Sequence, residues 1–152
     1  MNSFSQIYIM AVFGVKYRLR MINHDIRESI HKMIWTILEA HGKGSKPLAI
    51  GGTADHIHIL FTLSPNIALS DLLREVKSRS SRWINEQYGG GFEWQRGYGA
   101  FSYSQSSKPN VLAYIGNQEE HHRKISFREE VQRFLTSYEL ASDPRDLPAD
   151  PI

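Results

Sequence analysis

The chain has no cysteine, which excludes disulfide bonds and thiolate metal sites. A chain without disulfides fits a reducing compartment, and we expect a cytoplasmic protein. No apolar run approaches the roughly 20 residues that a membrane-spanning helix needs. The first residues carry no charged leader followed by a cleavage site, so we expect no signal peptide and no membrane partner.

The chain also lacks a strong charge of one sign. Its 152 residues include 18 Lys and Arg against 16 Asp and Glu, a net charge of +2. Residues 142–152 hold three aspartates and one arginine, so the rest of the chain is at +4. A mildly basic body permits a nucleic-acid partner without requiring one.

The hydrophobic pattern predicts a single α+β domain. Strands are expected at residues 5–15, 47–51, 56–63 and 98–104, and helices at about 25–42, 70–89, from 106 onward, and 126–140. This β-α-β-β-α-β order is the split βαβ pattern of ferredoxin-like folds. It predicts an antiparallel sheet with helices packed mainly on one face. We expect the domain to cover residues 1–141 and the Pro-rich tail, residues 142–152, to be disordered.

Two histidines and a tyrosine–glutamine pair form the most informative pattern. His56 and His58 lie two apart in a predicted strand, so their imidazoles project from one face. Tyr114 and Gln118 lie four apart in a predicted helix, so their side chains also share a face. Two imidazoles and an amide oxygen suit a divalent-metal site with open positions. A phenol beside that site suits nucleophilic attack on a phosphodiester.

Each of these residues also has an ordinary structural interpretation. Two histidines on the wet face of an antiparallel strand are usually only surface residues. A tyrosine at helical spacing more often packs in a core or at its rim than acts as a nucleophile. Asp55 could orient a histidine from behind or simply form the turn before the strand. His121 could compete as a ligand or, with His122, belong to a solvated helix end.

Basic and aromatic residues are interleaved in residues 16–18 and 94–98, a pattern that suits phosphates and unpaired bases of a nucleic acid. The alternative is ordinary packing, because aromatic rings beside a sheet more often belong to the core. The candidates for contacts to DNA are Lys16, Tyr17, Arg18, Lys77, Arg82 and Arg96.

Five segments follow one another along about residues 8–135. They are VFGVKYR, GGTADHIHIL, LREVKSRSSRWIN, WQRGYGAFSYS and VLAYIGNQEEHH. Together they resemble the single-tyrosine HUH transposases of the smallest bacterial insertion sequences, the TnpA or IS200-like type. The short His-x-His motif is weak alone, whereas the ordered set at these spacings is specific.

The resemblance implies a metal-dependent DNA transposase that nicks and rejoins single-stranded DNA and recognises hairpins at the ends of an element. The two histidine ligands correspond to His56 and His58, the nucleophile to Tyr114, and the third ligand to Gln118 on the same helix. The expected cofactor is Mg²⁺ or Mn²⁺, and the expected intermediate is a 5′-phosphotyrosine beside a free 3′-hydroxyl. The resemblance also implies a homodimer, in which one subunit's tyrosine helix can complete the other's site.

Other functions remain open at this point. A related branch of transposase-like proteins is associated with dispersed palindromic repeats and shares the same core. Replication and conjugation initiators use similar chemistry, but they usually carry further domains. A non-catalytic ferredoxin-like module that binds nucleic acid on its sheet would need no metal and form no covalent adduct.

Overall fold

A computed structural model describes residues 1–148 of the chain. Its centre is one antiparallel sheet of four strands in the order β2-β3-β1-β4. The strands are β1 (Tyr8–Gly14), β2 (Lys46–Gly52), β3 (His56–Thr62) and β4 (Gly99–Tyr103). This order and the alternation of strands and helices confirm the ferredoxin-like α+β fold that the sequence predicts.

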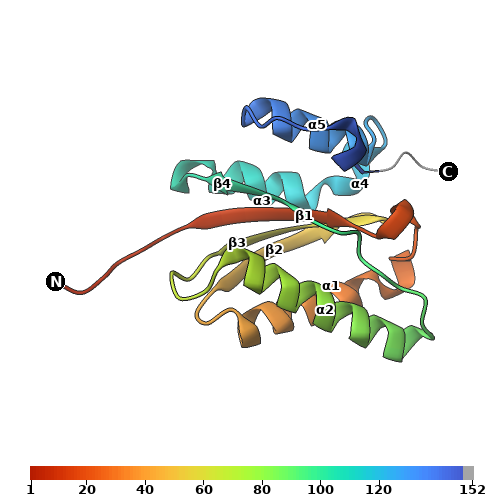
Figure 1. Cartoon of the computed structure of the whole chain (residues 1–152), viewed down its shortest axis with the longest axis horizontal. Helices are drawn as coiled ribbons and strands as arrows, with labels where there is room; N and C mark the ends of the chain where they lie inside the picture. The colour runs from red at the N-terminus through yellow and green to blue at the C-terminus, as the bar shows by residue number, and fades with distance from the viewer. Residues whose placement is uncertain (149–152) are drawn as a thin grey trace.

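The helices lie on both faces of this sheet (Figure 1). The two longest, α1 (His24–His41) and α2 (Leu69–Tyr88), pack together on one face. The sequence predicted that the helices would pack mainly on one face, and the helices after β4 depart from this because they cover the other face. Three shorter helices lie on the opposite face: α3 (Lys108–Gly116), α4 (Gln118–His122) and α5 (Phe127–Ser137). Three 3₁₀ turns, η1 (Lys16–Arg18), η2 (Gln105–Ser107) and η3 (Pro144–Asp146), complete the described elements.

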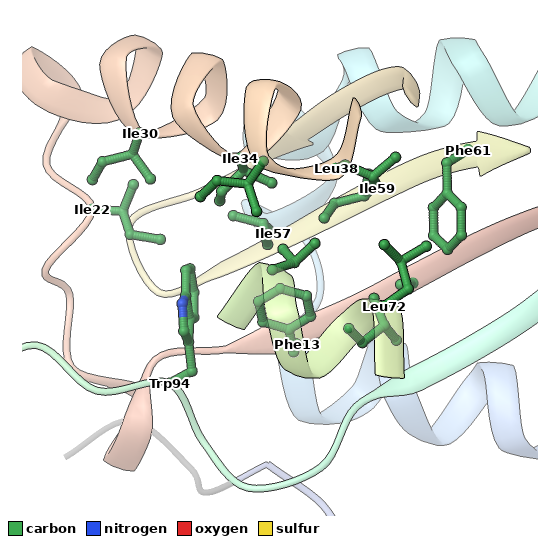
Figure 2. Packing of buried hydrophobic residues seen from close by; sticks show 14 of the residues in the cluster. Phe13, Ile22, Ile30, Ile34, Leu38, Ile57, Ile59, Phe61, Leu72 and Trp94 are labelled. Atoms are coloured by element: carbon green, nitrogen blue, oxygen red, sulfur yellow. The ribbon is translucent and has the colours of Figure 1, made fainter. Parts of the chain in front are cut away.

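The alternation of side chains along β3 divides them between two cores. Ile57, Ile59 and Phe61 pack beneath α1 and α2, together with Phe13 and other residues of the larger core (Figure 2). The intervening positions of β3 face the other way, where Leu60 joins the smaller core beneath α3 and α5. The histidines of β3 therefore lie on a covered face of the sheet rather than on a wet one.

The helix expected to carry both Tyr114 and Gln118 is interrupted between them. Helix α3 ends at Gly116, and Asn117 has the non-helical dihedrals φ −110° and ψ 24° before α4 begins at Gln118. Glycine and asparagine are both weak helix formers, which explains a break at this pair. The expected continuous helix is thus replaced by two helices, and Gln118 is the first residue of the second.

The C-terminal tail is partly described. Arg128 on α5 donates hydrogen bonds to the carbonyls of Pro144 (3.1 Å) and Pro148 (2.9 Å), so the turn η3 is held against α5. Residues 149–152, the rest of the tail predicted to be disordered, lie outside the described residues. Within residues 1–148, no helix is long and apolar enough to cross a membrane.

Candidate active site

The structure brings the four predicted site residues together under the C-terminal helices. His56 and His58 are both fully buried on β3, with ring centroids 5.4 Å apart. His56 Nε2 lies 3.2 Å from Gln118 Oε1, and the ring centroid of Tyr114 lies 5.6 Å from that of His58. Both pairs predicted from strand and helix spacing therefore converge on one point.

Asp55 fixes the orientation of His56. Its Oδ1 lies 2.7 Å from His56 Nδ1, while its Oδ2 accepts a hydrogen bond from Arg18 at 3.3 Å. Burial tends to raise the pKa of Asp55, but His56 and Arg18 outweigh it and lower the pKa to about 2. An ionised carboxylate accepts a hydrogen bond from the N–H of His56 Nδ1, so Nε2 of the neutral ring directs its lone pair toward Gln118.

Gln118 is oriented by its own backbone neighbourhood. Its Nε2 donates to the carbonyl oxygen of Tyr114 at 3.3 Å, so its Oε1 turns inward. That oxygen lies 3.2 Å from His56 Nε2 and 3.0 Å from His122 Nε2. The side-chain oxygen of Gln118 thus faces the ring nitrogens of His56 and His122 across the centre of the site.

Glu130 on α5 occupies the middle of the cluster. Its Oε1 lies 2.9 Å from His58 Nε2 and 3.2 Å from His122 Nε2. Its Oε2 lies 3.1 Å from His121 Nε2 and accepts a hydrogen bond from the hydroxyl of Tyr114. Burial alone would raise the pKa of Glu130, but the adjacent imidazoles of His122 and His58 outweigh it and hold the pKa far below its usual range.

The hydroxyl of Tyr114 is held in its protonated form in this arrangement. Burial and the adjacent negative charge of Glu130 raise the pKa of Tyr114 well above its ordinary value. His121 Nε2 lies 3.2 Å from the same hydroxyl oxygen. Burial lowers the pKa of His56, so its imidazole favours the neutral form that can act as a ligand.

The donor set fits a divalent cation. One ligand atom from each of His56, His58, His122 and Glu130 lies within 4.8 Å of the others. Gln118 Oε1 lies beside them. These atoms are acceptors that would repel one another unless protons or a cation lie between them. Imidazole nitrogen with carboxylate and amide oxygen is a ligand set for ions such as Mn²⁺ or Zn²⁺, and Mg²⁺ prefers oxygen alone.

Comparison with known proteins shows the family of the chain. Residues 3–118 match the family model described as "Transposase IS200 like". The chain belongs to the IS200-like transposase family. It is 22% identical to the ISDra2 transposase TnpA of Deinococcus radiodurans over 120 residues, which cover 74% of this chain and 84% of that protein. Over 78 residues, 51% of this chain and 50% of the relative, it is 30% identical to the transposase for insertion sequence element IS200 of Salmonella typhimurium.

Two solved structures share the fold. A putative transposase from Deinococcus radiodurans superposes with a TM-score of 0.63 at 18% identity, covering 78% of this chain and 95% of that one. A REP-associated tyrosine transposase bound to a REP hairpin superposes with a TM-score of 0.60 at 15% identity, covering 100% and 99% of the two chains. At these identities the likeness establishes the fold alone.

The predicted DNA contacts of this IS200-like transposase lie in different environments. Arg82 and Arg96 are exposed, and Tyr17 is 65% exposed at a left-handed φ of 60°. Lys16 pairs with Glu93 at the surface (2.8 Å). These residues stay candidates for contacts to DNA.

Arg18 and Lys77 have interior partners instead. Arg18 is only 8% exposed and lies against Asp55. The ammonium of Lys77 donates to the carbonyls of Gln95 and Gly97, both at 2.7 Å, and burial lowers the pKa of Lys77 to about 8. The geometry thus favours a structural role for both side chains over a direct contact with phosphate.

Sequence reasoning did not select Glu130 or assign His122 to the transposase site. Glu130 has a recognisable signature, because it lies on the helix face defined by Phe127, Val131 and Phe134, where an apolar residue is expected. An acidic residue on the buried stripe of an amphipathic helix needs a partner. The place of Glu130 on this apolar face therefore indicated, from the sequence, that its carboxylate has a partner in the interior.

Proposed function

We propose that the protein is a DNA transposase that nicks and rejoins single-stranded DNA through a phosphotyrosine on Tyr114. The observation that supports this most directly is the contact of the Tyr114 hydroxyl with Glu130, whose other carboxylate oxygen faces His58. A nucleophile next to a cluster of metal-type ligands suits phosphodiester cleavage. Membership of the IS200-like family supports the same reaction class.

In the proposed reaction, the phenolic oxygen of Tyr114 attacks phosphorus and the bond to the 3′-oxygen of the DNA breaks. The products are a 5′-phosphotyrosine and a free 3′-hydroxyl, which takes up a proton from solvent. Glu130 accepts the hydrogen bond of the phenol and is placed to receive its proton. Because the phosphodiester is stored on the tyrosine, a second 3′-hydroxyl can reverse the step and rejoin DNA without ATP.

His56, His58 and Gln118 are the proposed metal ligands, with Mg²⁺ or Mn²⁺ as cofactor. When bound, the ion would draw charge from the non-bridging phosphate oxygens and orient the scissile phosphate. Asp55 holds His56 in the ligand tautomer from behind. The stacking of Phe127 on His56, with centroids 4.2 Å apart and planes within 9°, restricts the ring further.

Hairpin DNA is the proposed substrate, because a solved structure of the same fold is a REP-associated transposase bound to a REP hairpin. A repeat-associated function is therefore the second candidate, supported by superposition along nearly the full length of both chains. We also propose a homodimer, although Tyr114 already reaches the histidines of its own chain. If the two subunits of such a dimer exchanged their tyrosine helices, the contact that Tyr114 makes with the histidines of its own chain would be replaced by the same contact between subunits.

Covalent trapping tests the proposal. Single-stranded DNA from the flanks of the gene, with and without predicted hairpins, is incubated with the protein and Mn²⁺. A denaturant-resistant protein–DNA adduct should form, require metal, and map to Tyr114. The Tyr114→Phe variant should bind the same DNA without forming the adduct, and Tyr103→Phe is the matched control. An adduct in the Tyr114→Phe variant would exclude Tyr114 as nucleophile, and metal-independent binding without any adduct would favour a non-catalytic module.

A further inference from the structure

We propose that His122 and Glu130 are ligands of the same metal ion as His56, His58 and Gln118. This inference rests on the proposed metal-dependent function and extends its ligand set to α4 and α5. The consequence is a site in which the segment after the tyrosine closes over the ion, with three imidazoles, a carboxylate and an amide oxygen.

The tautomer of His122 is set by a backbone contact. Its Nδ1 lies 3.0 Å from the backbone carbonyl oxygen of Ile125, which can only accept a hydrogen bond. The proton of the neutral ring therefore sits on Nδ1, and the lone pair of Nε2 points at the cluster. This is the arrangement found behind metal-bound histidines, where the second ring nitrogen is anchored by a carbonyl or carboxylate.

His122 Nε2 faces two oxygen atoms that cannot donate a hydrogen bond to it. It lies 3.0 Å from Gln118 Oε1 and 3.2 Å from Glu130 Oε1, both of which are acceptors. Gln118 cannot relieve this by rotating its amide, because its Nε2 is engaged by the carbonyl of Tyr114. A divalent cation between these atoms turns three repulsive lone pairs into ligands.

Glu130 is a buried carboxylate. Its side chain is 2% exposed, and a carboxylate withdrawn from water needs a compensating positive charge. Its Oε1 lies 2.9 Å from His58 Nε2 and 3.8 Å from His56 Nε2, the two histidines already proposed as ligands. No lysine or arginine side chain pairs with Glu130 among the ion pairs of residues 1–148, so the imidazoles are its only basic neighbours there.

The enlarged set changes the metal preference. Three imidazoles favour Mn²⁺, Co²⁺ or Zn²⁺ over Mg²⁺, which prefers oxygen ligands and keeps its waters. We therefore expect Mn²⁺ to bind this chain more tightly than Mg²⁺, because Mg²⁺ gives up its waters reluctantly and imidazole suits it poorly.

Calorimetric titration of Mn²⁺ into the full chain, without DNA, tests the ligand set independently of activity. His122→Asn and Glu130→Gln should each weaken the affinity at least tenfold. Glu129→Gln, an exposed neighbour on α5, and His24→Asn, an exposed histidine on α1, are the matched controls and should bind as the wild type does. The visible absorption of bound Co²⁺, which reports ligand number and type, should change in both test variants and in neither control.

The outcomes separate this proposal from the proposed function. If both test variants bind Mn²⁺ within about twofold of the wild type while His56→Ala abolishes binding, His122 and Glu130 are not ligands. The ligands are then only the three residues of the proposed function. If the wild type binds no divalent ion, the metal requirement of the proposed function fails as well. Circular dichroism monitors folding, and if Glu130→Gln does not fold, His122→Asn with its Co²⁺ spectrum decides.

Discussion

Glu130 connects Tyr114 to the histidine cluster through the two oxygens of one carboxylate. Its Oε2 accepts the hydrogen bond of the tyrosine hydroxyl, and its Oε1 lies 2.9 Å from His58 Nε2. The group that faces the proposed metal site is thus the same group that orients the proposed nucleophile. Any displacement of α5 would change both at once, because both contacts depend on one side chain.

Removing either histidine of β3 should abolish cleavage because the metal is no longer held. His56→Ala and His58→Ala should each lower single-strand nicking by on the order of 100-fold or more, because removing a ligand costs at least as much as removing a supporting group. Quantitative gel assays at a fixed Mn²⁺ concentration measure the effect, with His24→Ala as control. Full nicking by either variant, or by chelator-treated wild type, would contradict the metal assignment.

Gly51 should be intolerant of any side chain. A Cβ added there would lie 2.2 Å from the carbonyl oxygen of Ile115 and 2.8 Å from its Cγ2, because α3 packs directly on β2. Gly51→Ala should therefore destabilise the fold by about 1–3 kcal/mol and displace the helix that carries Tyr114. Urea denaturation measures the decrease in stability.

Gly116→Ala is the matched control for this substitution, because a Cβ there would meet nothing within 4 Å. Alanine is also the better helix former, so stability should be unchanged or slightly raised. Equal stability of the two variants would show that α3 does not pack against β2 as described.

Sequence alone predicted the half of the site that depends on local periodicity. Alternation along β3 is a property of neighbouring residues, so the shared face of His56 and His58 could be predicted. Their burial could not, because the helices that cover them come later in the chain and their packing is decided by tertiary contacts. The i, i+4 spacing of Tyr114 and Gln118 likewise predicted convergence correctly, although Asn117 interrupts the helix.

Glu130 marks the limit of that reasoning. It is separated from His58 by 72 residues, and their contact depends on the path of the chain after α3. On a helix with Glu129 next to it, an acidic residue is normally solvated, and only its place between Phe127 and Val131 on the buried stripe indicated otherwise. Non-local contacts of this kind require the fold before the residue can be assigned.

The exposed arginines and the half-buried Lys77 should have different effects on DNA binding. Arg82→Ala and Arg96→Ala should weaken single-strand binding and reduce the slope of log affinity against log salt by about 0.7 for each phosphate that the protein no longer neutralises. Lys77→Met should instead lower stability, because its ammonium holds the carbonyls of Gln95 and Gly97. Fluorescence anisotropy over a salt series measures the first effect and thermal denaturation the second. A salt slope unchanged in both arginine variants would remove these residues from the interface.

His31 should make stability depend on pH. It lies on α1 and is not one of the clustered ligand residues, and within residues 1–148 its Nε2 has no hydrogen-bond partner. Burial, with a smaller contribution from Arg27, lowers its pKa to about 4 from an ordinary 6.5. As the pH falls, His31 takes up a proton in the unfolded chain before it does so in the folded one. Neutral His31 therefore makes its full contribution to folding stability above pH 6.5. This contribution falls as the pH drops toward 4, by about 3 kcal/mol in all.

Chemical denaturation at intervals between pH 7 and pH 4 tests this dependence. The His31→Gln variant should lose stability less steeply than the wild type over this window, because glutamine does not titrate. His24→Gln, at an exposed position of the same helix, should follow the wild-type curve. The difference between the two variants isolates His31 from the carboxylates and from the histidine cluster, which titrate in both. Parallel curves for all three proteins would mean that His31 is protonated as readily in the folded chain as in the unfolded one.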